Sequence, residues 1–185
     1  MRVWRQLLGL IVMTHFEVFG LAPALDVDVK ALEQRLRELS LEFHPDRFVQ
    51  ADARTRVAAL EKTTALNDAF KVLRDPVKRA FYVLKLKGVD LDNEASAAQA
   101  KMPMTFLEEV MERREQLEAL KGKRDVTKAR VMADEIEKEK SSALALAKTA
   151  LSRDDVTEAT HQLGRVRYYS RFIEEVEALE EEAAS

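Results

Sequence analysis

The sequence contains no cysteine, and it has only 5 glycines and 4 prolines among 185 residues. Without cysteine the chain cannot form disulfides, and it cannot by itself hold an iron–sulfur cluster or a thiolate-bound zinc ion. Few glycines and prolines leave little material for the many turns of a sheet protein, whereas Ala, Leu, Glu, Lys and Arg dominate and favour long helices. The composition therefore predicts an all-α protein.

Histidine is also rare, and recognisable catalytic motifs are missing. His15, His44 and His161 lie far apart and not at the spacing of metal-ligand pairs, so we expect neither a bound metal ion nor another cofactor. The sequence has no Gly-rich phosphate loop, no cysteine nucleophile, and no Ser, His and Asp set placed by a known motif. We therefore expect a protein without catalytic activity of its own.

An excess of one charge and a long apolar run are likewise absent. Charged residues make up 34% of the chain, yet the formal net charge is only -3, so acidic and basic side chains alternate along solvated faces. Binding of nucleic acid needs a basic surface, which this balance does not predict. The longest apolar run, residues 7–13, is too short to cross a bilayer. We expect partners other than nucleic acid and membranes.

The first residues allow more than one interpretation. Arg2 and Arg5 precede the apolar run, and Ala22-Pro23-Ala24 resembles a small-residue cleavage site, as in a signal peptide. Phe16 intervenes between the two features and argues against secretion. We favour a different interpretation, in which translation begins at Met13 and residues 1–13 form an N-terminal extension with no assigned role.

The first half of the chain has the spacing of paired helices. Asp28 can cap a helix whose apolar residues recur at intervals of four, three and four, and Pro45 ends that helix. A second helix is predicted over about 52–74, and a third is predicted to end at Gly88. Together with a short lead helix, these elements predict an antiparallel helical hairpin with two short flanking helices over 14–88.

The second half has the pattern of a separate bundle. Periodicity fades over 89–102, which predicts a linker. Apolar residues then recur at helical spacing in three stretches, which predicts an antiparallel three-helix bundle over 103–185. Gly122 is expected to break the first of these helices, and Asp154 or Asp155 to cap the third.

The tripeptide His44-Pro45-Asp46 is the most specific feature of the sequence. It lies between two amphipathic helices, and the second of them ends in Asn67-Asp68-Ala69-Phe70 and Leu73-Arg74-Asp75-Pro76. This pattern resembles the J domain over roughly Thr14 to Gly88. The resemblance implies a co-chaperone that stimulates the ATPase of a heat-shock chaperone through this loop.

Among J domains, the sequence is most similar to the iron–sulfur assembly co-chaperones of the HscB family. The last helix of the J domain reads Arg79-Ala80-Phe81-Tyr82-Val83-Leu84, and a helical bundle follows in place of a glycine-rich or zinc-binding region. The segment from Phe106 to Glu115 also resembles the first bundle helix of that family. Animal members carry a cysteine-containing N-terminal extension, so its absence favours a bacterial, cytoplasmic form.

The resemblance implies two protein partners for a monomeric adaptor. The J domain is expected to bind an HscA-type heat-shock chaperone through His44, Pro45, Asp46, Arg37 and Arg47. The bundle is expected to bind the IscU-type scaffold, on which iron–sulfur clusters are assembled, through Leu107, Met111, Glu112, Arg114, Glu115 and Tyr168. Glu108 stands where the family usually has an apolar residue, so we expect the scaffold affinity to differ.

Several alternatives stay open at this point. The bundle could deliver a client other than the scaffold, and the charged residues of its first helix could simply be solvated. A coiled-coil structural protein is disfavoured, because Pro45, Pro76 and Gly88 interrupt any long heptad pattern. Tyr168 and Phe172 lie off the main apolar stripe of the last helix, so we expect an exposed aromatic patch; the alternative is that both pack in the bundle core.

Overall fold

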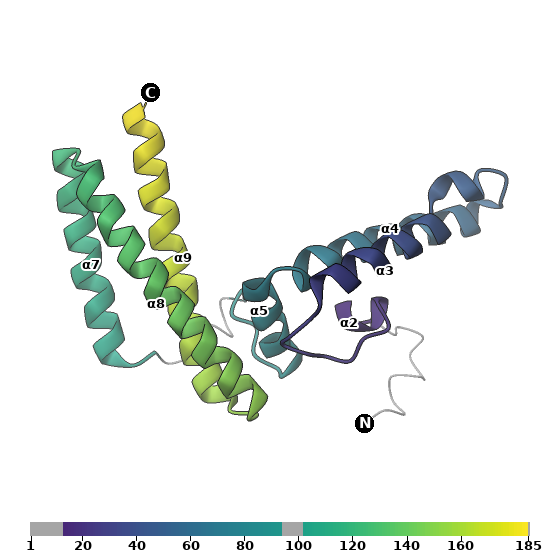
Figure 1. Cartoon of the computed structure of the whole chain (residues 1–185), viewed down its shortest axis with the longest axis horizontal. Coiled ribbons are helices and arrows are strands. Elements are labelled where there is room, and N and C mark those ends of the chain that lie inside the picture. The colour runs from purple at the N-terminus through teal and green to yellow at the C-terminus, as the bar shows by residue number, and fades with distance from the viewer. Residues whose placement is uncertain (1–12, 94–101, 185) are drawn as a thin grey trace. The chain divides into compact units, whose positions relative to one another are not determined.

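The computed structural model describes residues 13–93 and 102–184, and all regular structure within them is helical (Figure 1). The predicted N-terminal extension before Met13 and the linker segment 94–101 lie outside the described residues. The elements are α2 (His15–Val18), α3 (Val29–Glu42), the short 3-10 helix η1 (Pro45–Phe48), α4 (Ala53–Leu73), α5 (Pro76–Leu86), α7 (Met104–Lys123), α8 (Val126–Ser152) and α9 (Val156–Ala184). The prediction of an all-α protein is confirmed.

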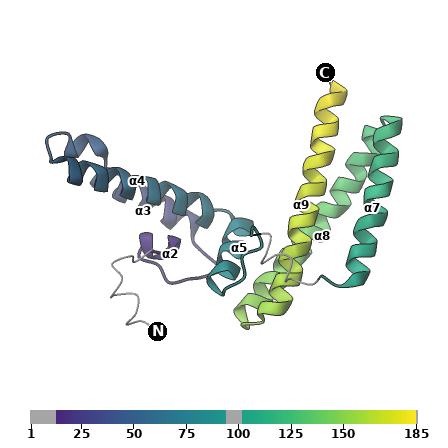
Figure 2. The same cartoon turned by 180° about the vertical axis from the view of Figure 1, so that it is seen from behind.

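Two compact units form, and the division between them falls inside α5, after Arg79. In the N-terminal unit, α3 and α4 lie side by side as a hairpin, and α2 packs against α4 (Figures 1 and 2). The apolar stripe expected on α3 faces α4, since Leu32 and Leu39 are buried. Phe16 of α2 is fully buried and closes this small core. The hairpin therefore presents the loop between α3 and α4 at one end.

Side chains cap the helices of the N-terminal unit, as the sequence predicts for Asp28. Thr14 and Glu17 form a reciprocal capping box at α2, in which the Thr14 amide donates to Glu17 Oε2 at 2.7 Å. Asp28 accepts the amides of the first turn of α3, and Asp52 accepts the Thr55 amide at the start of α4 at 2.9 Å. The cap at Asp52 fixes where α4 begins, and so it fixes the C-terminal end of the loop between the two hairpin helices.

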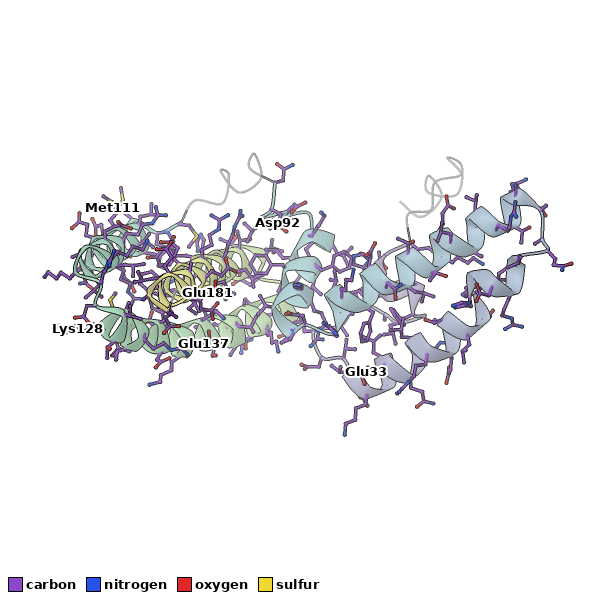
Figure 3. All side chains as sticks on the ribbon, turned by 90° about the horizontal axis from the view of Figure 1, so that it is seen from above. Glu33, Asp92, Met111, Lys128, Glu137 and Glu181 are labelled. Atoms are coloured by element: carbon purple, nitrogen blue, oxygen red, sulfur yellow. The ribbon has the colours of Figure 1, made fainter. Side chains whose placement is uncertain are left out.

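The C-terminal unit contains the antiparallel helices α7, α8 and α9, which Figure 3 shows with their side chains. The backbones of α8 and α9 approach most closely, because α8 faces α9 with small residues such as Ala133, Ala143 and Ala147, all of which are buried. In contrast, α7 meets α9 through large aromatic and charged side chains. This difference leaves a groove between α7 and α9.

The segment after α5 is attached to the bundle. Gly88 ends α5 with a φ of 99°, a conformation that favours glycine, as the sequence predicts. Beyond it Leu91 is buried, and its carbonyl oxygen accepts a hydrogen bond from the Arg167 guanidinium of α9. Lys87 also pairs with Asp154 at the turn before α9. The residues immediately after Gly88 are therefore held against the C-terminal unit.

Met102 marks where the described chain resumes. It packs on α9 at Gly164, where an added Cβ would lie 2.7 Å from the Met102 sulfur. Any larger residue at position 164 would displace this side chain. Gly164 therefore serves close packing, and α9 continues through it without interruption.

The expected break at Gly122 is wrong in its position. Helix α7 continues through Gly122 to Lys123, and Arg124 then takes a left-handed conformation with a φ of 53°. Glycine inside a helix costs only about 1 kcal/mol, so it weakens a helix without ending it. The boundary is set by Asp125, whose carboxylate accepts the Lys128 amide at 3.1 Å and begins α8.

Candidate functional site

The loop between α3 and α4 is shaped by its own histidine. His44 has an extended backbone with a ψ of 129° and forms the N-terminal cap of η1. Its Nδ1 atom accepts the amide proton of Asp46 at 3.3 Å. The Asp46 carboxylate lies 3.6 Å from the same nitrogen. The imidazole of His44 therefore contacts both the main chain and the side chain of residue 46.

Both polar side chains of the loop point outward. The side chain of His44 is 54% exposed and that of Asp46 is 85% exposed. Pro45 occupies the first position of η1, where its missing amide proton is not needed. The corner therefore presents an imidazole and a carboxylate to solvent, as an interaction with another protein would require.

Neighbouring residues hold the loop to both helices of the hairpin. The Arg47 guanidinium donates to the Leu41 carbonyl at 3.2 Å and so satisfies an acceptor at the end of α3. On the other side, Thr63 of α4 donates through Oγ1 to the Phe43 carbonyl at 3.1 Å, and Lys62 lies over the Phe43 ring at 4.4 Å. Arg47, predicted as part of a positive surface, therefore also has a local structural role.

Arg37 lies on α3 before the loop and is exposed. Glu38 follows it in sequence, but it pairs with Arg35 at 3.1 Å instead. Hydrogen bonds from Arg35, and then from Gln34, hold the pKa of Glu38 below its usual value. In the described parts of the chain, no ion pair or hydrogen bond joins Arg37 to a carboxylate or to the loop. Its charge is therefore not neutralised by Glu38.

The second set of predicted residues lies on the C-terminal unit. A groove of about 260 Å³ separates α7 from α9, and Leu107, Arg114 and Tyr168 are among its lining residues. The structure thus brings together three of the six predicted scaffold-binding residues, from two helices. The others, Met111, Glu112 and Glu115, lie on the exposed surface of α7 outside the groove, and Figure 3 marks Met111 there.

Aromatic side chains form the floor of this groove. Tyr168 is half-buried, its hydroxyl donates to the Val110 carbonyl of α7 at 3.2 Å, and burial raises its pKa. Its ring meets the buried Phe106 ring edge to face at 5.8 Å. The expectation of an exposed patch is wrong for Phe172, which is only 2% exposed. The buried stripe of α9 continues through Tyr169, Phe172 and Val176.

Two groove residues were not singled out from the sequence. Arg167 and Arg171 of α9 both line it, and Arg165 lies over the Phe106 ring at 4.8 Å. The available signal was the gathering of three arginines within residues 165–171, directly before the acidic end of the same helix. Such a local change of charge along one helix indicates a basic surface on a chain that is otherwise slightly acidic.

A half-buried ion pair joins α7 to α8 beside the aromatic cluster. Arg113 donates two hydrogen bonds to Glu139, at 2.9 and 2.8 Å, and also pairs with Glu109. The hydrogen bond from Arg113 is the main reason why the pKa of Glu139 lies below its usual value. Burial, followed by the hydrogen bond to Glu139, raises the pKa of Tyr169 to about 12. These groups link all three helices of the bundle.

Acidification is expected to destabilise the C-terminal unit as Glu139 becomes protonated. Because the folded-state pKa of Glu139 is lowered, its contribution is complete above the ordinary value of 4.5 and is lost as the pH falls through the folded value. The variant Arg113→Met should flatten the fall in urea midpoint between about pH 5 and pH 3. Arg130→Met, which breaks more exposed pairs with Asp134 and Glu180, is the control. An unchanged pH profile in Arg113→Met would contradict the role of Glu139.

Two other kinds of site are absent within residues 13–93 and 102–184. No three His, Cys, Asp or Glu side chains there are grouped so that they could hold a metal ion. No helix in the same residues is long and apolar enough to cross a bilayer. The described residues thus offer a protein-binding loop at residues 44–46 and a groove between α7 and α9, and neither has the ligands of a metal site.

Comparison with protein families gives a match in each half of the chain. Residues 14–82 match the DnaJ domain, and residues 102–177 match the HSCB C-terminal oligomerisation domain. A co-chaperone protein HscB homolog from Vibrio vulnificus (strain CMCP6) is 34% identical over 170 residues, which are 91% of this chain and 98% of the relative. The two family matches thus include both the loop and the groove.

Solved structures agree with these matches. Chaperone HscB from Vibrio cholerae superposes with a TM-score of 0.73 at 29% identity, over 92% of this chain and 99% of that one. The crystal structure of human co-chaperone protein HscB superposes with a TM-score of 0.75 at 26% identity, over 91% and 82% of the two chains. The predicted fold, a J domain followed by a C-terminal helical domain, is confirmed.

Proposed function

Since the chain belongs to the HscB family of J-domain co-chaperones, we propose that it binds an IscU-type scaffold and stimulates the ATPase of an HscA-type heat-shock chaperone. In this proposal residues 14–88 act as the J domain, 89–102 as the linker, and 103–185 as the scaffold-binding bundle, in a cytoplasmic protein. The observation that carries it is the outward-facing loop of residues 44–46, on a chain that also has the bundle groove. The hydrolytic chemistry belongs to the chaperone.

The loop acts by favouring one state of the chaperone over another. Stimulation requires that the loop bind the hydrolysis-competent conformation more strongly than the resting one, since equal binding would shift nothing. The Asp46 carboxylate supplies a charge for a basic group of the chaperone, and His44 keeps the loop in shape. Exposed charge pairs set orientation and association rate more than affinity, with about 1 kcal/mol or less from each pair.

The bundle supplies the second contact. A scaffold bound to the bundle is carried to the chaperone on the same molecule, so its local concentration near the chaperone rises without any new contact. Apolar side chains give such a surface its affinity, and Leu107 is 42% exposed beside the groove aromatics. The scaffold therefore reaches the chaperone on the same molecule whose loop promotes ATP hydrolysis by that chaperone.

The experiment that tests the proposal measures both contacts on the full chain. We expect calorimetry to show binding of the purified IscU-type scaffold, and ATP hydrolysis by the HscA-type chaperone to rise more with both proteins than with either alone. Leu107→Ala should weaken scaffold binding by about tenfold or more, because about 2 kcal/mol of apolar burial is lost. Val131→Ala, at an exposed position of α8, is the matched control. Absence of scaffold binding by the wild type would refute this function and favour delivery of a different client.

A further inference from the structure

The groove between α7 and α9 carries an excess of positive charge. Three arginines line it, Arg114, Arg167 and Arg171, against a single carboxylate, Glu175. That carboxylate is already shared, since it lies 3.8 Å from Arg114 and 3.3 Å from Lys121. The charge of Glu175 is therefore taken up by these two cations and does not compensate the other two arginines.

The remaining arginines have no acidic partner in the part of the chain that the structure describes. The Arg167 guanidinium donates to the carbonyl oxygen of Leu91, which is a neutral acceptor. Arg171 is exposed, and no carboxylate of the described residues lies within ion-pair distance of it. A chain with a formal net charge of -3 thus keeps a locally basic site at this groove. Unpaired guanidinium groups beside a hollow favour an anionic ligand.

The floor of the same groove is apolar. Phe106 and Phe172 are almost fully buried beneath it, and Tyr168 has its hydroxyl turned to the Val110 carbonyl, so its ring contributes an apolar surface. Leu107 adds an exposed apolar side chain at the edge. A free anion would leave these surfaces without a partner. A protein segment with an apolar side chain next to a carboxylate would contact both the floor and the arginines.

We propose that the groove binds an acidic and apolar segment of the scaffold, and that Arg171 pairs with a carboxylate of that segment. This inference rests on the proposed function and names the chemistry of the partner surface. The guanidinium of arginine fits a carboxylate with two parallel hydrogen bonds, so Arg171 gives orientation as well as attraction. Arg167, held by Leu91, adds positive charge without having to move.

The test compares the salt dependence of scaffold binding in three forms of the full chain. For the wild type we expect scaffold affinity to fall as ionic strength rises, because exposed charge pairs are screened. Arg171→Glu should weaken binding about tenfold at low salt and remove most of the salt dependence. Lys138→Glu makes the same change in net charge on α8, which contributes no residue to the groove, and should leave affinity within about twofold.

The apolar half of the groove gives an internal comparison. Leu107→Ala should weaken binding while leaving the salt dependence of the wild type in place, since it removes no charge. Equal affinity and equal salt dependence of wild type and Arg171→Glu would overturn the assignment of Arg171, while the proposed function would still stand. A wild type that does not bind the scaffold at all would instead refute the proposed function. Equal losses in Arg171→Glu and Lys138→Glu would also overturn the inference, because net charge alone would then explain the effect.

Discussion

Replacing Asp46 by asparagine is expected to abolish the acceleration of ATP hydrolysis by the HscA-type chaperone, with scaffold binding unchanged. The substitution removes a charge that is 85% exposed and whose partner within the loop is His44 Nδ1 at 3.6 Å, so we expect little change in the stability of the fold. The loop should keep its shape, because His44 accepts a hydrogen bond from the main-chain amide of residue 46, and this bond is still present in the asparagine variant. The expected loss is one of stimulation more than of affinity, because an exposed charge pair contributes about 1 kcal/mol or less to binding, whereas the carboxylate is needed to favour the hydrolysis-competent conformation.

Two further variants separate the charge from the shape of the loop. His44→Gln removes the Nδ1 acceptor of the Asp46 amide, so we expect it to abolish stimulation as well, by loosening the loop. Asp68→Asn, at an exposed position of α4, makes the same chemical change away from the loop and should stimulate like the wild type. Steady-state ATPase rates, measured with scaffold present, decide the matter. Undiminished acceleration by Asp46→Asn would show that the Asp46 carboxylate is not needed to stimulate the chaperone.

Replacing Phe172 by alanine is expected to lower the free energy of unfolding of the C-terminal unit by about 3–5 kcal/mol. Its ring is 2% exposed and packs beside Tyr168, with ring centroids 6.3 Å apart. Truncation would leave a cavity under the groove floor, and the long helices α7 and α9 cannot close it without moving along their whole contact. Urea unfolding followed by circular dichroism measures the loss.

Leu146→Ala provides the matched comparison for this stability prediction. Leu146 lies on α8 and is 54% exposed, so its truncation should cost less than about 1 kcal/mol. Similar midpoints for Phe172→Ala and Leu146→Ala would show that Phe172 is not part of the core. The pair thus tests directly the correction that the structure makes to the expected aromatic patch.

Much of the fold follows from short-range signals in the sequence. Asp28, Asp52 and Pro76 set helix starts through local hydrogen bonds or a fixed φ, and such signals act within a few residues. The loop at residues 44–46 could be placed for the same reason, since a proline between two apolar stripes forces a corner. A corner at the end of a helical hairpin is expected to face solvent, and the exposed side chains of His44 and Asp46 agree with this expectation.

What the sequence could not provide depends on contacts between distant residues. Phe172 was expected on the wrong side of α9, because a small error in helical phase grows along a helix of 29 residues. Arg79 is buried and donates to the carbonyls of Leu25 and Leu73, a pairing that spans 54 residues in one case and has no local pattern. The groove arginines were missed because their shared surface exists only once α7 and α9 lie together.

The internal bonds of the loop have a consequence for the speed of recognition. Arg47 on the Leu41 carbonyl and His44 on the Asp46 amide fix the corner before any partner arrives. Little conformational entropy is then lost on contact, so even a small, weakly held surface can be productive at each collision. Release is equally quick, since few bonds must break. A preorganised contact of this kind lets one co-chaperone molecule serve many chaperone molecules in succession.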